Sequence, residues 1–290
     1  MNARRMIFEL YFEYIQHFGS SITPRSMLRL TSELNISANA TRAALCRLVK
    51  QGWLQRNKVE GRAIYLLTPL GRERLEEVRP RIFSSRHSDW DGQWTILTYS
   101  VPERLGHHRD RLRRELEFLG FGSMTPSTWI SPNALVDITL RHLSLRNLDG
   151  YVHLFRARQA SSQPHNLLIE RCYNLEGIQR HYVRFIKNWR GQREKLTAAN
   201  RPTENACFVA KMRLVYDFAD FVYLDPFLPS ELLPKDWLGY EAWRIFRDCY
   251  LLLSEPALSF FEKNFEGPPR TAKEQREGRV HALDQTPVEA

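Results

Sequence analysis

Cysteine is scarce in this chain of 290 residues, which contains four cysteines and no C-x-x-C pair. They are Cys46, Cys172, Cys207 and Cys249, and they lie far apart in the sequence. This spacing argues against the disulfide framework of small secreted domains and against a zinc-ligand motif, and it favours reduced thiols. We therefore expect a cytoplasmic protein.

Long hydrophobic runs are also lacking. No stretch approaches the roughly 20 apolar residues that a membrane-spanning helix needs. The first residues are basic, but no apolar segment of signal-peptide length follows them. Apolar residues are nevertheless plentiful, at 43% of the chain with seven Trp and 16 Phe, which predicts packed cores. At roughly 100–200 residues per domain, the length predicts two or three domains.

The positive charge is concentrated in the first third of the chain. In total, 42 Lys and Arg face 33 Asp and Glu, a formal net charge of +9. Residues 1–88 hold 15 Lys and Arg but only 7 Asp and Glu, whereas the other 202 residues are nearly balanced. A basic module on a nearly neutral body is typical of proteins that bind nucleic-acid phosphates. The alternative is a basic solvated surface that binds nothing.

Residues 1–88 show the pattern of a winged helix-turn-helix domain. Apolar residues recur at three- and four-residue spacing, and capping residues and glycines mark the helix ends. The predicted order is a helix over 4–18, a helix over 24–34, a helix over 38–51, strands over 53–59 and 63–68, and a helix over 69–83. Each element alone says little. Their order, with basic residues in the third helix and the strand pair, predicts a DNA-binding domain.

The third predicted helix carries the candidate DNA-reading face. At 100° per residue, its packing side holds Thr41, Ala44, Leu45, Leu48 and Val49. The opposite side and the N-cap give the candidate contacts Ser37, Asn39, Arg42, Ala43, Cys46, Arg47 and Lys50. Asn39 and Arg42 suit base edges, whereas the two later cations suit phosphates. The strand pair adds Arg56, Lys58 and Arg62 around Gly61, for which we expect phosphate contacts.

A ferredoxin-like unit is predicted after a polar break at 84–88. Its elements are a strand over 94–101, a helix over 104–119, a hairpin ending at 129–132, a helix over 133–145 and a strand over 151–157. Helical patterns follow over 167–196, 204–224 and 240–265. We therefore expect an α+β protein of four parts. These are a winged helix-turn-helix domain at 1–88, a ferredoxin-like domain at 89–160, a helical domain at 161–266 and a polar flexible tail at 267–290.

Motifs along most of the chain resemble those of the PaaX-like family. In the first part they are Arg47-Leu48-Val49, Gly52-Trp53-Leu54 and Tyr65-x-Leu67-Thr68-x-x-Gly71. In the middle they are Trp90-x-Gly92-x-Trp94, Pro102-Glu103, Arg109, Gly120-Phe121-Gly122 and Trp129-Ile130-Ser131-Pro132. In the last part they are Leu228-Pro229, Leu232-Leu233-Pro234, Trp237-x-Gly239, Ala242 and Phe246.

The resemblance implies a repressor of phenylacetic acid catabolism. It implies a homodimer that binds a palindromic operator in double-stranded DNA and releases it when an aryl-CoA thioester binds. The inducer of the family is phenylacetyl-CoA. Candidate effector-binding aromatics are Trp129, Tyr216, Trp237 and Tyr240. Aromatics at helical spacing more often belong to the core, which is the alternative for each of them.

Enzyme motifs are not found in the sequence. It has no G-x-x-x-x-G-K, no G-x-S-x-G and no H-E-x-x-H. His107 and His108 are adjacent and would point apart on a helix, so shared metal ligation is not expected. We predict no catalytic residues, no metal and no cofactor. The alternative function is an RNA-binding protein or a metal-dependent nuclease built on the ferredoxin-like domain. A nuclease would need carboxylates at the end of the first strand, and the chain offers Glu103 in the turn that follows it, where the residue can instead cap the helix over 104–119.

Overall fold

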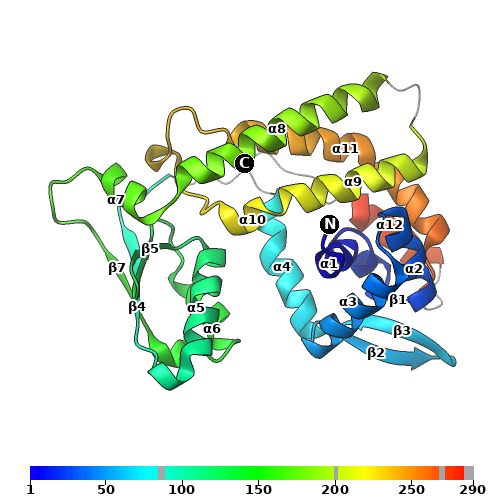
Figure 1. The fold of residues 1–290 in the computed structure, drawn as a ribbon, viewed down its shortest axis with the longest axis horizontal. Helices are drawn as coiled ribbons and strands as arrows, with labels where there is room; N and C mark the ends of the chain where they lie inside the picture. The colour runs from blue at the N-terminus through cyan, green and yellow to red at the C-terminus, as the bar shows by residue number, and fades with distance from the viewer. Residues whose placement is uncertain (84–88, 199–201, 268–271, 284–290) are drawn as a thin grey trace. The chain divides into compact units, whose positions relative to one another are not determined.

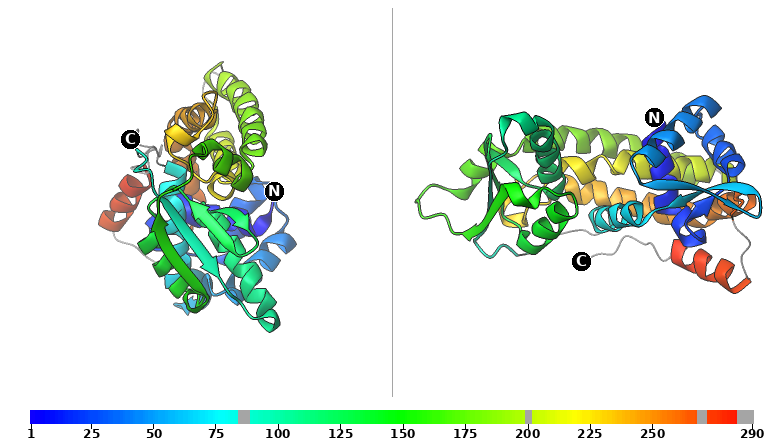
Figure 2. Two further views of the ribbon diagram at one scale, coloured as in Figure 1. Left: turned by 90° about the vertical axis from the view of Figure 1, so that its left-hand side faces the viewer. Right: turned by 90° about the horizontal axis from the view of Figure 1, so that it is seen from below.

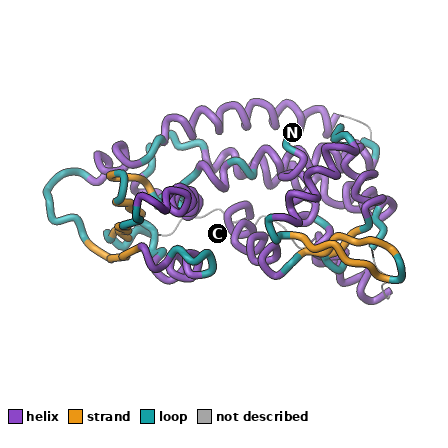
Figure 3. The backbone as a smooth tube through the Cα atoms, turned by 60° about the horizontal axis from the view of Figure 1, so that its bottom comes forward, coloured by secondary structure: helices purple, strands orange, loops and turns teal. Residues whose placement is uncertain are grey.

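The computed structural model describes residues 1–83, 89–198, 202–267 and 272–283. It contains helices and two small antiparallel sheets, which confirms the predicted α+β class (Figure 1). The chain divides into two compact units. Unit 1 comprises Met1–Ser84, Phe185–Ala219 and Glu241–Glu289, and unit 2 comprises Ser85–Arg184 and Asp220–Tyr240. Figure 3 shows that the strands gather at two places, one in each unit.

Unit 1 begins with a winged helix-turn-helix, called the head below. Its elements are α1 (Ala3–Glu13), η1 (Ile15–Phe18), β1 (Ser21–Ile22), α2 (Pro24–Glu33), α3 (Ala38–Lys50), β2 (Leu54–Val59), β3 (Arg62–Leu67) and α4 (Pro69–Phe83). The strands pair in the order β1-β3-β2. Thr23 caps α2 by accepting from the Ser26 N–H, and Ser37 caps α3 by accepting from the Ala40 N–H, both at 3.2 Å. The predicted element order of this region is confirmed.

The hairpin β2–β3 forms an exposed wing. From Gln55 to Val59, every residue of β2 is exposed, so neither face of this strand packs on the head. Val59 pairs with Arg62, and the two residues between them, Glu60 and Gly61, have φ values of 48° and 77°. Positive φ at both central residues is the type I′ geometry, which matches the twist of a two-stranded hairpin.

Helix α1 is buried along almost its whole length. Every residue from Met6 to Glu13 is buried, although a helix at a surface normally keeps a polar side. It lies between α3 and the helices α9 (Glu204–Phe218) and α11 (Gly239–Asn264). The following Tyr14 stacks on Phe261 of α11 with ring centroids 4.6 Å apart. The head and part of the predicted helical domain thus share one core, an arrangement that the predicted domain division did not contain.

Helix α12 (Ala272–Leu283) lies within the predicted flexible tail. It packs against η1, and Ala282 is buried. Arg279 forms ion pairs with Glu255 and Glu262 of α11. Part of the predicted tail, at 272–283, is thus described as a helix that packs within unit 1. The sequence shows little apolar periodicity there because small side chains and ion pairs make the contacts.

Unit 2 contains the predicted ferredoxin-like fold. In chain order its elements are β4 (Trp94–Tyr99), α5 (Gly106–Leu119), β5 (Gly122–Thr125), β6 (Thr128–Ser131), α6 (Val136–Ser144) and β7 (Val152–Ala157). The sheet is antiparallel throughout, with the order β5-β6-β4-β7. Helices α5 and α6 lie together on one face of it (Figures 1 and 2). The predicted β-α-β-β-α-β order is confirmed.

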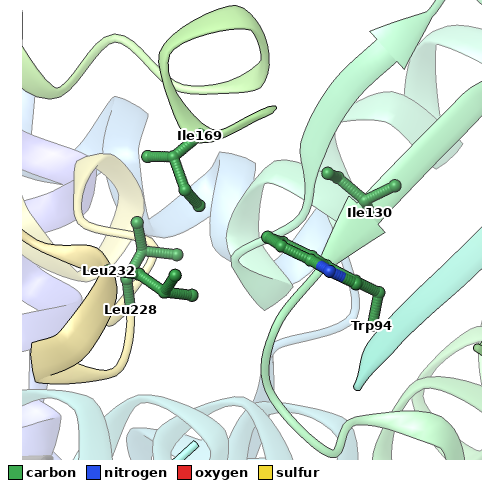
Figure 4. Packing of buried hydrophobic residues seen from close by; sticks show 5 residues of the cluster. All are labelled: Trp94, Ile130, Ile169, Leu228 and Leu232. Atoms are coloured by element: carbon green, nitrogen blue, oxygen red, sulfur yellow. The ribbon is translucent and has the colours of Figure 1, made fainter. Parts of the chain in front are cut away.

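The other face of this sheet is covered by α7 (His165–Cys172) and by a proline-rich segment after α10 (Phe221–Leu224). Trp94 and Ile130 of the sheet meet Ile169 of α7 and Leu228 and Leu232 of the segment (Figure 4). All five side chains are buried. Burying each contributes about 1.5–3 kcal/mol, so this cluster holds the segment on the sheet.

Two of the predicted long helices are interrupted. The helix predicted over 167–196 is α7 followed by α8 (Leu175–Ala198), because Tyr173 is extended and donates from its hydroxyl to the Ile130 carbonyl at 2.8 Å. Asn174 then accepts from the Gly177 N–H and starts α8. The helix predicted over 204–224 ends at Phe218, and α10 follows. Apolar periodicity continues across both breaks, so it could not reveal them.

Candidate nucleic-acid interface

Helix α3 packs on the head with one side and turns the other to solvent. Its buried residues are Thr41, Ala44, Leu45 and Leu48. Thr41 Oγ1 lies 2.9 Å from Thr31 Oγ1 of α2, a buried hydrogen bond that fixes the two helices together. The seven candidate contacts are all exposed, and they are Ser37, Asn39, Arg42, Ala43, Cys46, Arg47 and Lys50. The structure therefore places six of them on the exposed side of α3 and Ser37 at its N-cap.

Two of these residues form a hydrogen-bonded pair near the N-terminal end of α3. Arg42 Nη1 donates to Asn39 Oδ1 at 3.2 Å, across one helical turn. This contact holds a guanidinium and a carboxamide side by side. Both groups keep further N–H donors, and these two side-chain types make bidentate hydrogen bonds to guanine and adenine edges.

The cations of α3 and the wing carry no neutralising partner. Five residues have exposed side chains that form no hydrogen bond or ion pair with any residue that the structure describes, and they are Arg47, Lys50, Arg56, Lys58 and Arg62. Cations in other parts of the chain are often paired, for example in the ion pairs among helices α8, α9, α11 and α12. An uncompensated group of cations leaves a positive potential, which attracts phosphates.

The base of the wing is fastened to both α3 and α4. Thr68 Oγ1 donates to the Gly52 carbonyl at 2.6 Å, just after the end of α3. The same oxygen accepts from the Gly71 N–H at 3.1 Å, in the first turn of α4. Arg56 and Lys58 lie two residues apart on β2 and therefore on the same face of that strand. The wing and α3 can thus act as one rigid surface.

Three further residues suited to DNA contact were not predicted from the sequence. Gln55 and Asn57 alternate with the wing cations on β2 and are exposed. Arg25 lies in the first turn of α2, is exposed and has no partner among the described residues. The sequence did contain a signal for the exposure of the two amides. Their strand has polar residues at both alternating sets of positions, so neither of its faces is apolar. A half-buried strand would carry apolar residues at every second position.

Behind the head, a buried ion pair joins α1 to α9. Glu13 is 0% exposed and Lys211 is 1% exposed, with Lys211 Nζ 3.1 Å from Glu13 Oε2. Tyr250 of α11 donates from its hydroxyl to the same oxygen at 2.8 Å. Burial lowers the pKa of Lys211, while the Glu13 carboxylate acts in the opposite direction. This polar cluster orients α1, against which α3 packs.

The four candidate effector residues are divided between the two units. Tyr216 belongs to unit 1, where its hydroxyl accepts from the Asn2 N–H at 2.9 Å. Trp129, Trp237 and Tyr240 belong to unit 2. Trp129 is buried on β6, Trp237 packs edge-on against Tyr182 at 5.5 Å, and Tyr240 is exposed. As an effector site, this set stays a prediction.

The next observations concern the alternative of a metal-dependent nuclease and the expected lack of a membrane-spanning helix. Within the described ranges, no group of three or more His, Cys, Asp or Glu could hold a metal ion, and Glu103 is exposed at the start of a short 3-10 turn. No helix among the described residues is long and apolar enough to span a membrane. On α5, Arg113 Nε donates to the Tyr99 hydroxyl at 3.0 Å, which raises the pKa of this arginine.

The fold and the exposed cations define a winged helix-turn-helix protein with a ferredoxin-like unit. Three family models match consecutive parts of the chain. "PaaX-like protein" matches residues 2–71, "PaaX protein central Cas2-like domain" matches 87–169, and "PaaX-like protein C-terminal domain" matches 173–263. The chain belongs to the PaaX-like family, as its motifs predicted.

Individual relatives agree with this assignment. The transcriptional repressor PaaX of Escherichia coli (strain K12) is 28% identical over 273 residues, which cover 92% of this chain and 85% of the relative. The solved structure of the uncharacterized protein Rv0674 from Mycobacterium tuberculosis is similar with a TM-score of 0.50 and 23% identity. That match covers 84% of this chain and 91% of the other, and it supports the fold alone.

Proposed function

We propose that this protein is a DNA-binding transcriptional repressor without enzymatic activity. The observation that carries the proposal is the exposed group of unpartnered cations on α3 and the wing. The similarity to a transcriptional repressor over 92% of the chain supports it. A cytoplasmic location goes with this function, because the operator is chromosomal.

The residues of the interface have separate roles in this proposal. Asn39 and Arg42 read base edges in the major groove, and Ala43 offers a methyl surface beside them. The five unpartnered cations and the Ser37 end of α3 contact phosphates, with Cys46 within the strip. Five phosphate contacts per head correspond to a slope of about −4 to −5 in log affinity against log salt concentration.

Family membership supports the regulatory part of the proposal. The protein acts as a homodimer on a palindromic operator, because a two-fold site needs two heads about 34 Å apart. The operon that it controls degrades an aromatic acid such as phenylacetate. An aryl-CoA thioester such as phenylacetyl-CoA binds outside the head and lowers operator affinity.

Fluorescence anisotropy with the DNA upstream of the protein's own operon, and with random DNA, tests the DNA-binding function. Arg42→Ala should weaken operator binding more than random binding, because a bidentate base contact contributes about 1–3 kcal/mol of discrimination. Lys58→Ala should weaken both similarly and reduce the salt slope by about one. Equal loss on both DNAs would assign Arg42 to phosphate. No preference of the wild type for its upstream DNA contradicts the function.

The regulatory part has its own measurements. Light scattering on the full chain should give the mass of a dimer, and a monomer at micromolar concentration contradicts the two-fold model. Titration of the operator complex with phenylacetyl-CoA, phenylacetate and CoA should release DNA with the thioester at the lowest concentration. Release by the free acid at equal potency would exclude recognition of the thioester.

A further inference from the structure

A groove between α8 and α9 within unit 1 has the size and lining of a small-molecule site. Its volume is about 720 Å³. Ligand pockets typically enclose about 300–1,000 Å³. Helix α8 contributes Asn188, Trp189 and Gln192, and α9 contributes Val209, Arg213 and Asp217. The candidate DNA contacts of α3 and the wing do not line it.

The aromatic wall of the groove is held in place. Trp189 is 3% exposed, and its indole N–H donates to Asp217 Oδ2 at 3.1 Å. This hydrogen bond links α8 to α9 and fixes the orientation of the ring. The indole is therefore a fixed part of the groove wall, and the half-buried Val209 beside it offers apolar surface to a ligand. A wall that is already held in place costs a ligand little free energy of rearrangement.

Arg213 supplies a charge to the groove that the protein itself leaves unused. Its side chain is exposed and forms no hydrogen bond or ion pair with any residue that the structure describes. Two arginines of the neighbouring α8 are paired, Arg190 with Glu241 and Arg193 with Asp248. A guanidinium binds carboxylates and phosphates in a bidentate manner. The amides of Asn188 and Gln192 add neutral donors and acceptors at the same site.

Helix α9 connects this groove to the head. Its opposite side is buried and includes Lys211, which forms the ion pair with Glu13 of α1. Asn205 lines the groove and also donates from Nδ2 to Glu33 Oε2 at 2.7 Å, at the last residue of α2. Helices α1 and α2 both pack against α3. A ligand that moves Asn205 or α9 therefore acts on the two helices that support the DNA-reading face.

We propose that this groove is an effector site for an amphiphilic organic anion. A carboxylate or phosphate of the ligand binds Arg213, its apolar part lies on Val209 against the wall that Trp189 fixes, and its binding lowers the DNA affinity of α3. The last step rests on the proposed DNA-binding function, whereas the site does not. An effector shifts DNA binding only by the difference in its affinity for the two states, and DNA weakens effector binding by the same factor.

Isothermal titration calorimetry on the full chain without DNA tests the site alone. The probes are phenylacetyl-CoA, phenylacetate, CoA and inorganic phosphate. Arg213→Gln removes the charge, and Val209→Phe fills the groove. Arg244→Gln is the matched control, because Arg244 is another exposed arginine without a partner among the described residues and does not line the groove. Thermal melts followed by circular dichroism show that each variant is folded.

We expect phenylacetyl-CoA or phenylacetate to bind the wild type, and comparison with CoA and phosphate identifies the anion that is recognised. Loss of one charge-assisted contact should weaken binding by about tenfold or more in Arg213→Gln, and Val209→Phe should show a comparable loss. The Arg244→Gln control should bind like the wild type. Binding of none of the four probes, or unchanged binding in both folded groove variants, overturns the site.

Operator release then tests the coupling to the head. Glu33→Ala removes the acceptor of Asn205 on α2, and Glu33 does not line the groove. This variant should still bind the probe but should release operator DNA at a higher probe concentration than the wild type does. Release by the wild type and Glu33→Ala at the same concentration overturns this route. A wild type that shows no preference for its upstream DNA contradicts the proposed function, and the calorimetric result on the groove stands separately.

Discussion

Replacing Lys211 by Met breaks the buried ion pair that joins α9 to α1. Glu13 and Lys211 are 0% and 1% exposed, so water cannot take the place of the lost ammonium group. Methionine nearly keeps the length of the side chain, and the change is therefore mainly electrostatic. Among the described residues, the hydroxyl of Tyr250 at 2.8 Å is then the one donor left to Glu13. Removing one partner of a buried pair costs about 3–5 kcal/mol, and we expect a loss of that size in unfolding free energy.

The loss should depend on pH in a defined direction. Burial lowers the pKa of Lys211 in the folded wild type, so towards alkaline pH the unfolded chain binds more protons than the folded one. The stability of the wild type should therefore rise with pH in that range, whereas Lys211→Met lacks this titrating group. The difference between the wild type and the variant should be larger at pH 9 than at pH 6. In a unit of 150–250 residues, 3 kcal/mol corresponds to a decrease of about 6–12 °C in Tm.

Urea denaturation of the wild type and the variant at both pH values measures this effect. The double variant Glu13→Leu/Lys211→Met removes both charges and serves as the control. It should be more stable than Lys211→Met alone, since apolar replacement of a whole buried pair is often neutral. A loss below about 1 kcal/mol in the single variant, equal at both pH values, would refute the reasoning from burial.

Other perturbations test separate parts of unit 1. Burial is the main cause that lowers the pKa of His17 in the folded protein from 6.5 to about 3. The free energy of unfolding should therefore decrease as the pH falls below 6.5, by about 2 kcal/mol at pH 5. His17→Gln should flatten that dependence in urea titrations. In Gly71→Ala the new Cβ would lie 2.4 Å from the Trp53 carbonyl, so a loss of about 1–3 kcal/mol is expected, and an unchanged Tm would contradict this. Glu60→Gln removes an exposed carboxylate from the wing tip and should raise affinity for random DNA by about 0.2–1 kcal/mol, measured by anisotropy.

The parts of the fold that the sequence predicted correctly are those with local causes. The start of α3 follows from the Ser37 cap, and the wing turn follows from Glu60 and Gly61, which need no contact from a distant segment. The break between α7 and α8 has a different cause. It depends on the Tyr173 hydroxyl, which reaches the carbonyl of Ile130 on another element. No spacing within residues 167–196 contains that contact.

The candidate DNA contacts could be predicted more completely than the candidate effector residues. Exposure on α3 follows from helical periodicity, and the structure places all the predicted contacts of α3 on its exposed side. The choice of Trp129, Tyr216, Trp237 and Tyr240 rested on residue type, which indicates burial but not which elements meet. The groove between α8 and α9 is formed by Trp189 and residues of α9, and their proximity depends on tertiary packing.

The burial of α1 has a consequence for how the protein is made. Glu13 leaves the ribosome early, but its partner Tyr250 lies 237 residues later in the chain. At roughly 5–20 residues per second, synthesis of that interval takes about 10–50 s. During this time the apolar side of α1 that α9 and α11 will cover has no partner within the nascent chain. The winged helix-turn-helix is thus translated well before α9 and α11 and reaches its final packing only after both helices have been synthesised.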